Sequence, residues 1–130
     1  MAFLIHSIDD GHVPAWEYLP CSAITPKVGM ALVQSSGNLT TASGTTAPTF
    51  ISMVERDSAV TAGDLIPVIR VSKDIVFGTT LSAAGSSLKK GQKVTIASNG
   101  LQVTATTTDG VAEIVDVIDA ASGGEVLVRF

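Results

Sequence analysis

The chain has 130 residues, which is enough for one domain with a hydrophobic core of its own. Hydrophobic residues make up 45% of the chain and charged residues only 15%. This composition excludes a disordered chain and is typical of a β-rich protein whose surface is partly covered by a partner. The net charge is −4 and the basic residues are scattered, so we expect no nucleic-acid partner. Because no apolar run approaches the length of a membrane helix, we expect no membrane partner either.

Residues 1–27 differ from the rest of the chain. They contain both histidines, Trp16 and Tyr18, and three of the prolines, and they show neither helical nor alternating periodicity. The pattern predicts an extended N-terminal arm that docks on a partner or adds a strand to its sheet edge. We expect this arm to bind through its large apolar side chains, namely Phe3, Leu4, Ile5, Ile8, Trp16 and Tyr18. Deletion of residues 1–12 is accordingly expected to leave a folded β domain.

The arm contains the segment H-S-I-D-D-G-H, which begins at His6. Asp-Asp-Gly is a turn signal that would bring His6 and His12 toward each other, and Asp9 could join them around a metal ion. Since the chain has no further histidine, such a site would lack ligands. We interpret the segment as a polar turn and expect no metal and no cofactor.

The β domain is expected to span residues 28–130, and its two ends resemble each other. The motif V-G-M-A-L-V-Q-S-S-G-N-L opens the domain, and K-G-Q-K-V-T-I-A-S-N-G-L follows later. The same offset separates Gly29 from Gly91 and Leu32 from Val94. This pattern indicates two similar halves.

We place these pseudo-repeated halves at residues 28–71 and 90–130, with a connector at residues 72–89. Each half has the pattern strand, turn, strand, loop, strand, turn, strand. Short strands at such spacing predict an all-β fold, either a small β-barrel or a sandwich. Pro67 interrupts a strand-like run and is expected in an edge strand or a bulge, because proline cannot donate to a ladder.

No motif in the chain indicates catalysis. There is no G-x-S-x-G elbow, and most carboxylates stand at turn positions. Cys21 is the only cysteine, which excludes an internal disulfide. It could pair with a histidine as a nucleophile, but a small buried cysteine is the commoner case. We therefore expect no catalytic residue and no enzyme activity.

Several motifs resemble the head decoration, or capsid cementing, proteins of tailed bacteriophages. They are K-V-G-M-A-L-V-Q-S-S-G-N-L, A-P-T-F-I-S-M-V, A-G-D-L-I-P-V-I-R-V, L-K-K-G-Q-K-V-T-I and the C-terminal G-G-E-V-L-V-R-F. The likeness covers roughly residues 25–130. The resemblance implies a β-clip-like or barrel domain that forms homo-oligomers, with a trimer favoured.

The resemblance also implies a function. Such a protein binds the major capsid protein on the outer face of the virion, stabilises the shell against packaged DNA, and is made in the host bacterial cytoplasm. By position, residues 1–20 match the segment that the family uses against the capsid lattice. The alternative is a carbohydrate- or cell-binding β module of a phage fibre or surface adhesin. That class should present exposed aromatic side chains in a groove.

Overall fold

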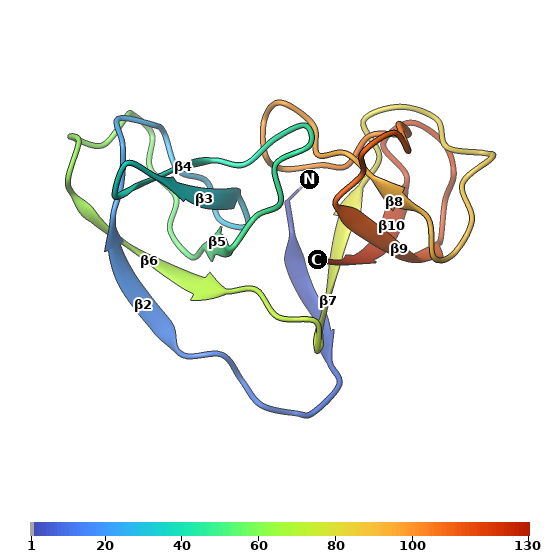
Figure 1. Cartoon of the computed structure of the whole chain (residues 1–130), viewed down its shortest axis with the longest axis horizontal. Helices are drawn as coiled ribbons and strands as arrows, with labels where there is room; N and C mark the ends of the chain where they lie inside the picture. Colours follow the sequence, from blue (N-terminus) through green and yellow to red (C-terminus); the bar gives the residue numbers. More distant parts are fainter. Residues whose placement is uncertain (1) are drawn as a thin grey trace.

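The computed structural model describes residues 2–130 and shows two antiparallel five-stranded sheets, which confirms the all-β prediction. Sheet I has the strand order β2-β6-β5-β3-β4, and sheet II has the order β1-β7-β10-β9-β8. Figure 1 shows sheet I on the left, β8, β9 and β10 on the right, and β1 and β7 between them. The strands are β1 (Leu4–Ile8), β2 (Trp16–Pro20), β3 (Ala31–Ser35), β4 (Asn38–Thr41), β5 (Phe50–Ser52), β6 (Leu65–Arg70), β7 (Ile75–Thr80), β8 (Lys93–Val94), β9 (Ala112–Val117) and β10 (Glu125–Arg129).

Neither sheet closes into a barrel. A single parallel bridge, Cys21 to Leu39, joins the two edges of sheet I at one end, and another, Leu81 to Val103, lies just beyond β7. The architecture is that of a small β-sandwich rather than the barrel that the strand spacing also allowed. Within residues 2–130 no helix is long and apolar enough to cross a membrane.

The β3–β4 hairpin shows how local sequence sets the strands. Ser35 pairs with Asn38, so the loop between the strands has only two residues, Ser36 and Gly37. Their φ angles are 51° and 83°. Positive φ at both central positions defines the type I′ turn, whose twist matches that of the flanking strands.

The two sheets share one pattern of pairing. β2, β6, β5 and β3 are neighbours in sheet I in the same order as β7, β10, β9 and β8 in sheet II. The Gly29 N–H donates to the Ser52 carbonyl at 2.8 Å, and the Gly91 N–H donates to the Ile114 carbonyl at 2.8 Å. Gly29 and Gly91, which match in the sequence, therefore occupy equivalent positions in the two sheets.

The similarity extends beyond the boundaries that the sequence suggested. β2, from the expected arm at residues 1–27, occupies in sheet I the place that β7 occupies in sheet II. β7 itself lies in the expected connector, residues 72–89. β1 pairs with β7, and β2 pairs with β6. The N-terminal segment is therefore not separate from the β domain, because each of its strands completes one sheet.

Pro67 lies in an interior strand, contrary to the expectation of an edge or a bulge. β6 stands between β2 and β5. The Pro67 carbonyl accepts a hydrogen bond from the Met53 N–H at 2.9 Å, so the backbone of Pro67 faces the β5 side. Since β5 ends at Ser52, the ladder on that side stops where the proline would have had to donate.

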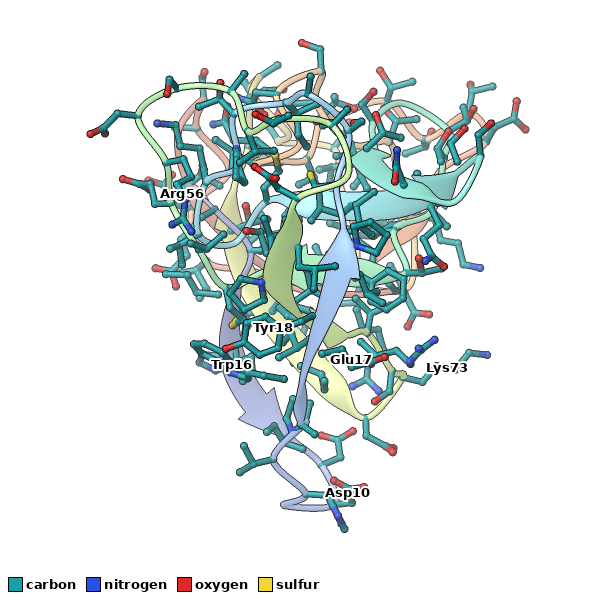
Figure 2. The ribbon with its side chains drawn as sticks, turned by 90° about the vertical axis from the view of Figure 1, so that its left-hand side faces the viewer. Asp10, Trp16, Glu17, Tyr18, Arg56 and Lys73 are labelled. Carbon is teal, nitrogen blue, oxygen red and sulfur yellow. The ribbon has the colours of Figure 1, made fainter. Side chains whose placement is uncertain are left out.

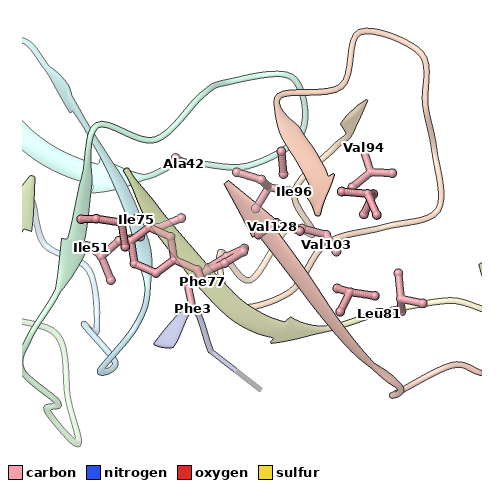
Figure 3. Packing of buried hydrophobic residues seen from close by; sticks show 14 of the residues in the cluster. Phe3, Ala42, Ile51, Ile75, Phe77, Leu81, Val94, Ile96, Val103 and Val128 are labelled. Atoms are coloured by element: carbon pink, nitrogen blue, oxygen red, sulfur yellow. The ribbon is translucent and has the colours of Figure 1, made fainter. Parts of the chain in front are cut away.

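The main core lies between the sheets. Ala31, Ile51 and Ile69 of sheet I belong to one buried cluster with Ile75 and Phe77 of sheet II. Figure 3 shows Ile51 and Ile75 on one side of this cluster, with Phe77 and Phe3 next to them. A second, smaller cluster lies on the other face of sheet I and is formed by Cys21, Met30, Leu32, Leu39, Phe50, Ile66 and Val68.

Phe3 belongs to the main core and not to a partner-binding arm. Its side chain is 1% exposed, and its ring centroid lies 5.3 Å from that of Phe130 in an edge-to-face arrangement. The Phe3 N–H donates to the Gly29 carbonyl at 2.9 Å. The expectation that Phe3 binds a partner is therefore wrong, because its apolar surface is already covered by this chain.

Candidate interaction surface

β2 presents an aromatic face to solvent. Trp16 is 56% exposed and Tyr18 is 60% exposed, and Figure 2 shows both on the same side of the strand, with Glu17 on the other. The register places Tyr18 opposite Pro67 and Pro20 opposite Leu65, which is itself 61% exposed. Because paired residues share a face, these five side chains form a continuous apolar surface, which we call the β2 face.

The opposite side of β2 carries an ion pair to the neighbouring strand β6. Arg70 donates two hydrogen bonds to the Glu17 carboxylate, at 2.9 and 3.1 Å. The hydrogen bond and the charge of Glu17 raise the pKa of Arg70. The guanidinium also lies 4.8 Å from the ring centroid of Phe50. An exposed pair of this kind stabilises a fold only slightly, but its bidentate geometry fixes the side chains of two neighbouring strands.

β1 contributes a second exposed apolar region. Leu4 is 55% exposed and Ile5 is 42% exposed, whereas Ile8 is partly buried against the main core. An open groove of about 440 Å³ runs beside the strand; it is lined by Ala2, Leu4, Ile5, His6, Gly78, Thr79, Thr80, Gly123 and Glu125. Of the side chains predicted to bind a partner, the structure thus leaves Leu4 and Ile5 accessible on β1, and Trp16 and Tyr18 on β2.

The H-S-I-D-D-G-H segment begins within β1 and ends in a turn. The Asp10 carboxylate accepts a hydrogen bond from the His12 N–H at 2.8 Å, and Gly11 follows with a φ of 70°. Asp9 is 3.4 Å from the Arg129 guanidinium, which ties the start of the turn to β10. Throughout the described part of the chain, no three His, Cys, Asp or Glu side chains come close enough to hold a metal ion.

Cys21 is buried at the end of β2. Its thiol lies 3.7 Å from the Leu39 carbonyl, and burial raises the pKa of the thiol. The raised pKa lowers the fraction of Cys21 present as the reactive thiolate at neutral pH.

We expect the Cys21 thiol of the folded protein to react with a disulfide reagent at least roughly a hundredfold more slowly than in denaturant, because reaction requires local opening. The measurement is the rate of colour release by an aromatic disulfide at mildly alkaline pH. The same chain in guanidinium chloride is the control. Equal rates would contradict the buried position of Cys21.

Sequence reasoning missed the residues that complete the β2 face. Leu65, Pro67 and Pro20 join Trp16 and Tyr18 only through the pairing of β2 with β6, which are distant in sequence. The alternation of Trp16, Tyr18 and Pro20 over one strand was the available signal.

In comparisons with known proteins, no family model and no curated protein matches the chain. The resemblance to phage decoration proteins therefore has no support beyond the motifs themselves. The exposed apolar side chains of β1 and β2 are the surface features from which a function can be inferred.

Proposed function

We propose that the chain is a structural capsid decoration protein that binds the major capsid protein on the outer face of a phage head and stabilises the shell. The observation that carries this proposal is the exposure of large apolar side chains on two edge strands. Leu4 and Ile5 are accessible on β1, and Trp16 and Tyr18 are accessible on β2. Edge strands with exposed apolar residues are suited to pairing with another chain.

The magnitude of the apolar contribution fits a specific partner. Burial of one large apolar side chain contributes about 1.5–3 kcal/mol. The four side chains are already about half buried, so covering the rest of them would contribute roughly 3–6 kcal/mol, from which the cost of association must be subtracted. On a capsid, many copies bound to one lattice would stiffen the shell even when each contact is of moderate affinity.

One observation favours the alternative, a carbohydrate- or cell-binding module. Trp16 and Tyr18 lie on the same face of β2 and are both more than half exposed. Flat aromatic rings in such a position can stack on the apolar face of a sugar. The groove, however, lies beside β1 and is not lined by either ring. This separation favours protein contact over a sugar site.

Cosedimentation with empty heads tests the proposal. The heads are assembled from the major capsid protein encoded in the same genome as this chain. We expect saturable binding, and we expect the double substitution L4A/W16A to weaken it by at least about tenfold, or 1.4 kcal/mol. Ile118→Ala is the matched control, because Ile118 is as exposed as Trp16 but lies beyond the end of β9.

Absence of binding to these heads would contradict the decoration function. Binding to immobilised glycans that is lost in Trp16→Ala would support the alternative instead. Equal weakening by Ile118→Ala would show that the β1 and β2 residues have no special role in the contact.

A further inference from the structure

A groove opens in sheet II where β1 leaves β7. The pairing of β1 with β7 ends at Leu4, which stands opposite Gly78. β10 continues farther along β7 and places Glu125 opposite Thr80. Before Leu4 the chain turns inward, because the side chain of Phe3 is buried in the main core. The groove of about 440 Å³ described above lies at this step, and we call it the β1 groove.

The β1 groove is a hollow on the outer face of sheet II and not a free strand edge. Beyond Gly78 the edge of β7 is occupied, because the Val103 N–H donates to the Thr80 carbonyl at 3.2 Å. Phe77 points into the main core, so its neighbour Gly78 faces away from the core. Glu125, which lines the same groove, is on this outer face as well. An occupant would therefore contact side chains rather than extend the sheet.

The missing side chain of Gly78 creates the hollow. Gly78 has no positive φ, and a Cβ atom built on it meets no atom closer than 3.8 Å. The backbone therefore does not require a glycine at this position. The nearest atoms to that Cβ position are Cδ2 of Leu127 at 3.8 Å, and Oε1 of Glu125 and the carbonyl oxygen of Leu4, both at 3.9 Å. A side chain inserted above Gly78 would lie among these three residues.

The charge of the β1 groove indicates what it can receive. Glu125 is the only carboxylate in its lining, and no lysine or arginine lines it. Among the residues that the structure describes, Glu125 takes part in none of the ion pairs. Leu4 and Ile5 supply apolar walls that are exposed to solvent. A hollow of this kind is complementary to a side chain with an aliphatic stem and a cationic head, which is the form of arginine and lysine.

We propose that the β1 groove receives a basic side chain of the partner protein, with arginine preferred to lysine. The aliphatic stem lies over Gly78 between Leu4 and Leu127, and the cationic head reaches the Glu125 carboxylate. Arginine is preferred because its guanidinium can donate two parallel hydrogen bonds to one carboxylate. This inference deepens the proposed function and rests on it for the identity of the partner, whose surface would be that of the major capsid protein.

Nuclear magnetic resonance titration of the purified chain with two capped tripeptides tests the groove itself. One peptide is Leu-Arg-Leu, and in the other norleucine, which has a similar stem and no charge, replaces arginine. We expect the arginine peptide to shift the amide signals of Leu4, Gly78 and Thr80. It should bind at least about threefold more tightly than the norleucine peptide, since an exposed ion pair adds only modestly to affinity. Equal binding of the two peptides, shifts confined to other residues, or no binding of either would overturn the proposal.

Two variants separate the charge of the groove from its shape. Glu125→Gln should abolish the preference for arginine and leave the affinity for the norleucine peptide unchanged. Gly78→Val should weaken both peptides by at least about tenfold, because its side chain fills the hollow. Circular dichroism verifies that the variants are folded, and Glu125→Gln decides the matter alone if Gly78→Val does not fold. A preference for arginine that persists in Glu125→Gln would contradict the role of this carboxylate.

Cosedimentation with empty heads tests whether the partner uses the groove. Glu125→Arg should weaken binding by at least about tenfold. Asp57→Arg, the same change of charge at an exposed residue outside the groove, should leave binding intact. Equal binding by the two variants would overturn the assignment of the partner's basic side chain to this groove.

The two experiments fail independently. If the unmodified chain does not bind heads, the decoration function is wrong, whereas the peptide titration still decides whether the groove binds a basic side chain. Sedimentation of the chain alone tests the other possible occupant. Self-association that Glu125→Gln abolishes would show that a second copy supplies the basic side chain, and would overturn the assignment to another protein.

Discussion

Replacing Phe3 with alanine is expected to lower the free energy of unfolding by about 3–5 kcal/mol. Phe3 is almost fully buried and packs edge-to-face against Phe130 in the cluster that joins the two sheets. Truncation would leave a cavity beside the Phe130 ring in this cluster. Since a small domain has a net stability of only about 5–15 kcal/mol, the loss should be visible as a large shift of the urea midpoint.

The neighbouring Leu4 provides the control. Its side chain is 55% exposed, so Leu4→Ala should change the midpoint far less than Phe3→Ala. Deletion of residues 1–12 removes β1 together with Phe3, and we now expect it to abolish cooperative unfolding rather than leave a folded domain. A truncated chain that unfolds with the midpoint of the full chain would show that the N-terminal strand is dispensable.

The second half of the chain was the easier part to predict. In V-A-E-I-V-D-V-I, residues 111–118, Ala112, Ile114 and Ile118 stand on one side of an alternating pattern that predicts a strand, and β9 spans Ala112–Val117. Val126, Val128 and Phe130 alternate in the same way, which predicts a strand over 125–130, and β10 spans Glu125–Arg129. Because each of these strands has one face in the core, apolar residues recur at every second position of its sequence.

The N-terminal segment could not be assigned because its pattern is broken. β1 is an edge strand with an irregular ladder, so its apolar residues do not alternate cleanly. Its partner β7 begins with Ile75 and Val76 and is buried on both faces, which gives a continuous apolar run. A short run of this kind between Lys73-Asp74 and a glycine is the signal of a buried strand, but periodicity alone does not reveal it.

The register of the repeat also required the structure. In the sequence, Gly63-Asp64-Leu65 resembles Gly124-Glu125-Val126, but the hydrogen bonds make Gly63 equivalent to Gly123. Both Gly63 and Gly123 have positive φ, of 94° and 82°. Their N–H groups donate to the carbonyls of Cys21 and Leu81, each at 2.8 Å. The turn geometry at these two glycines, which short motifs do not encode reliably, fixes the equivalence.

The candidate surface was predicted in part. Trp16, Tyr18, Leu4 and Ile5 were named from their apolar character, and the structure leaves all of them accessible. The same reasoning could not separate them from Phe3, because an apolar residue in a segment without periodicity carries no sign of its burial. Nor could it show that the β2 edge is regular while the β1 edge is not, since that difference arises from pairing.

Replacing Gly110 with alanine should destabilise the protein by roughly 3 kcal/mol or more, at or above the upper end for overpacking. The chain crosses β8 at this point, where the Val111 N–H donates to the Val94 carbonyl at 3.0 Å. A Cβ atom on Gly110 would overlap the backbone carbonyl group of Lys93. Backbone atoms cannot rotate aside as a flexible side chain can, so β8 would have to separate from β9. Thermal and urea unfolding measure the loss.

Gly37→Ala is the matched control, because it isolates the cost of conformation from the cost of contact. Gly37 has a φ of 83°, but a Cβ built there meets no atom within 4 Å. Alanine in this conformation should cost only about 1–2 kcal/mol. Gly110 has no such φ, so its larger effect would come entirely from the approach of the chain to β8. If Gly110→Ala is milder than Gly37→Ala, the chain does not pass this closely over β8, and the pairing at the end of sheet II must be revised.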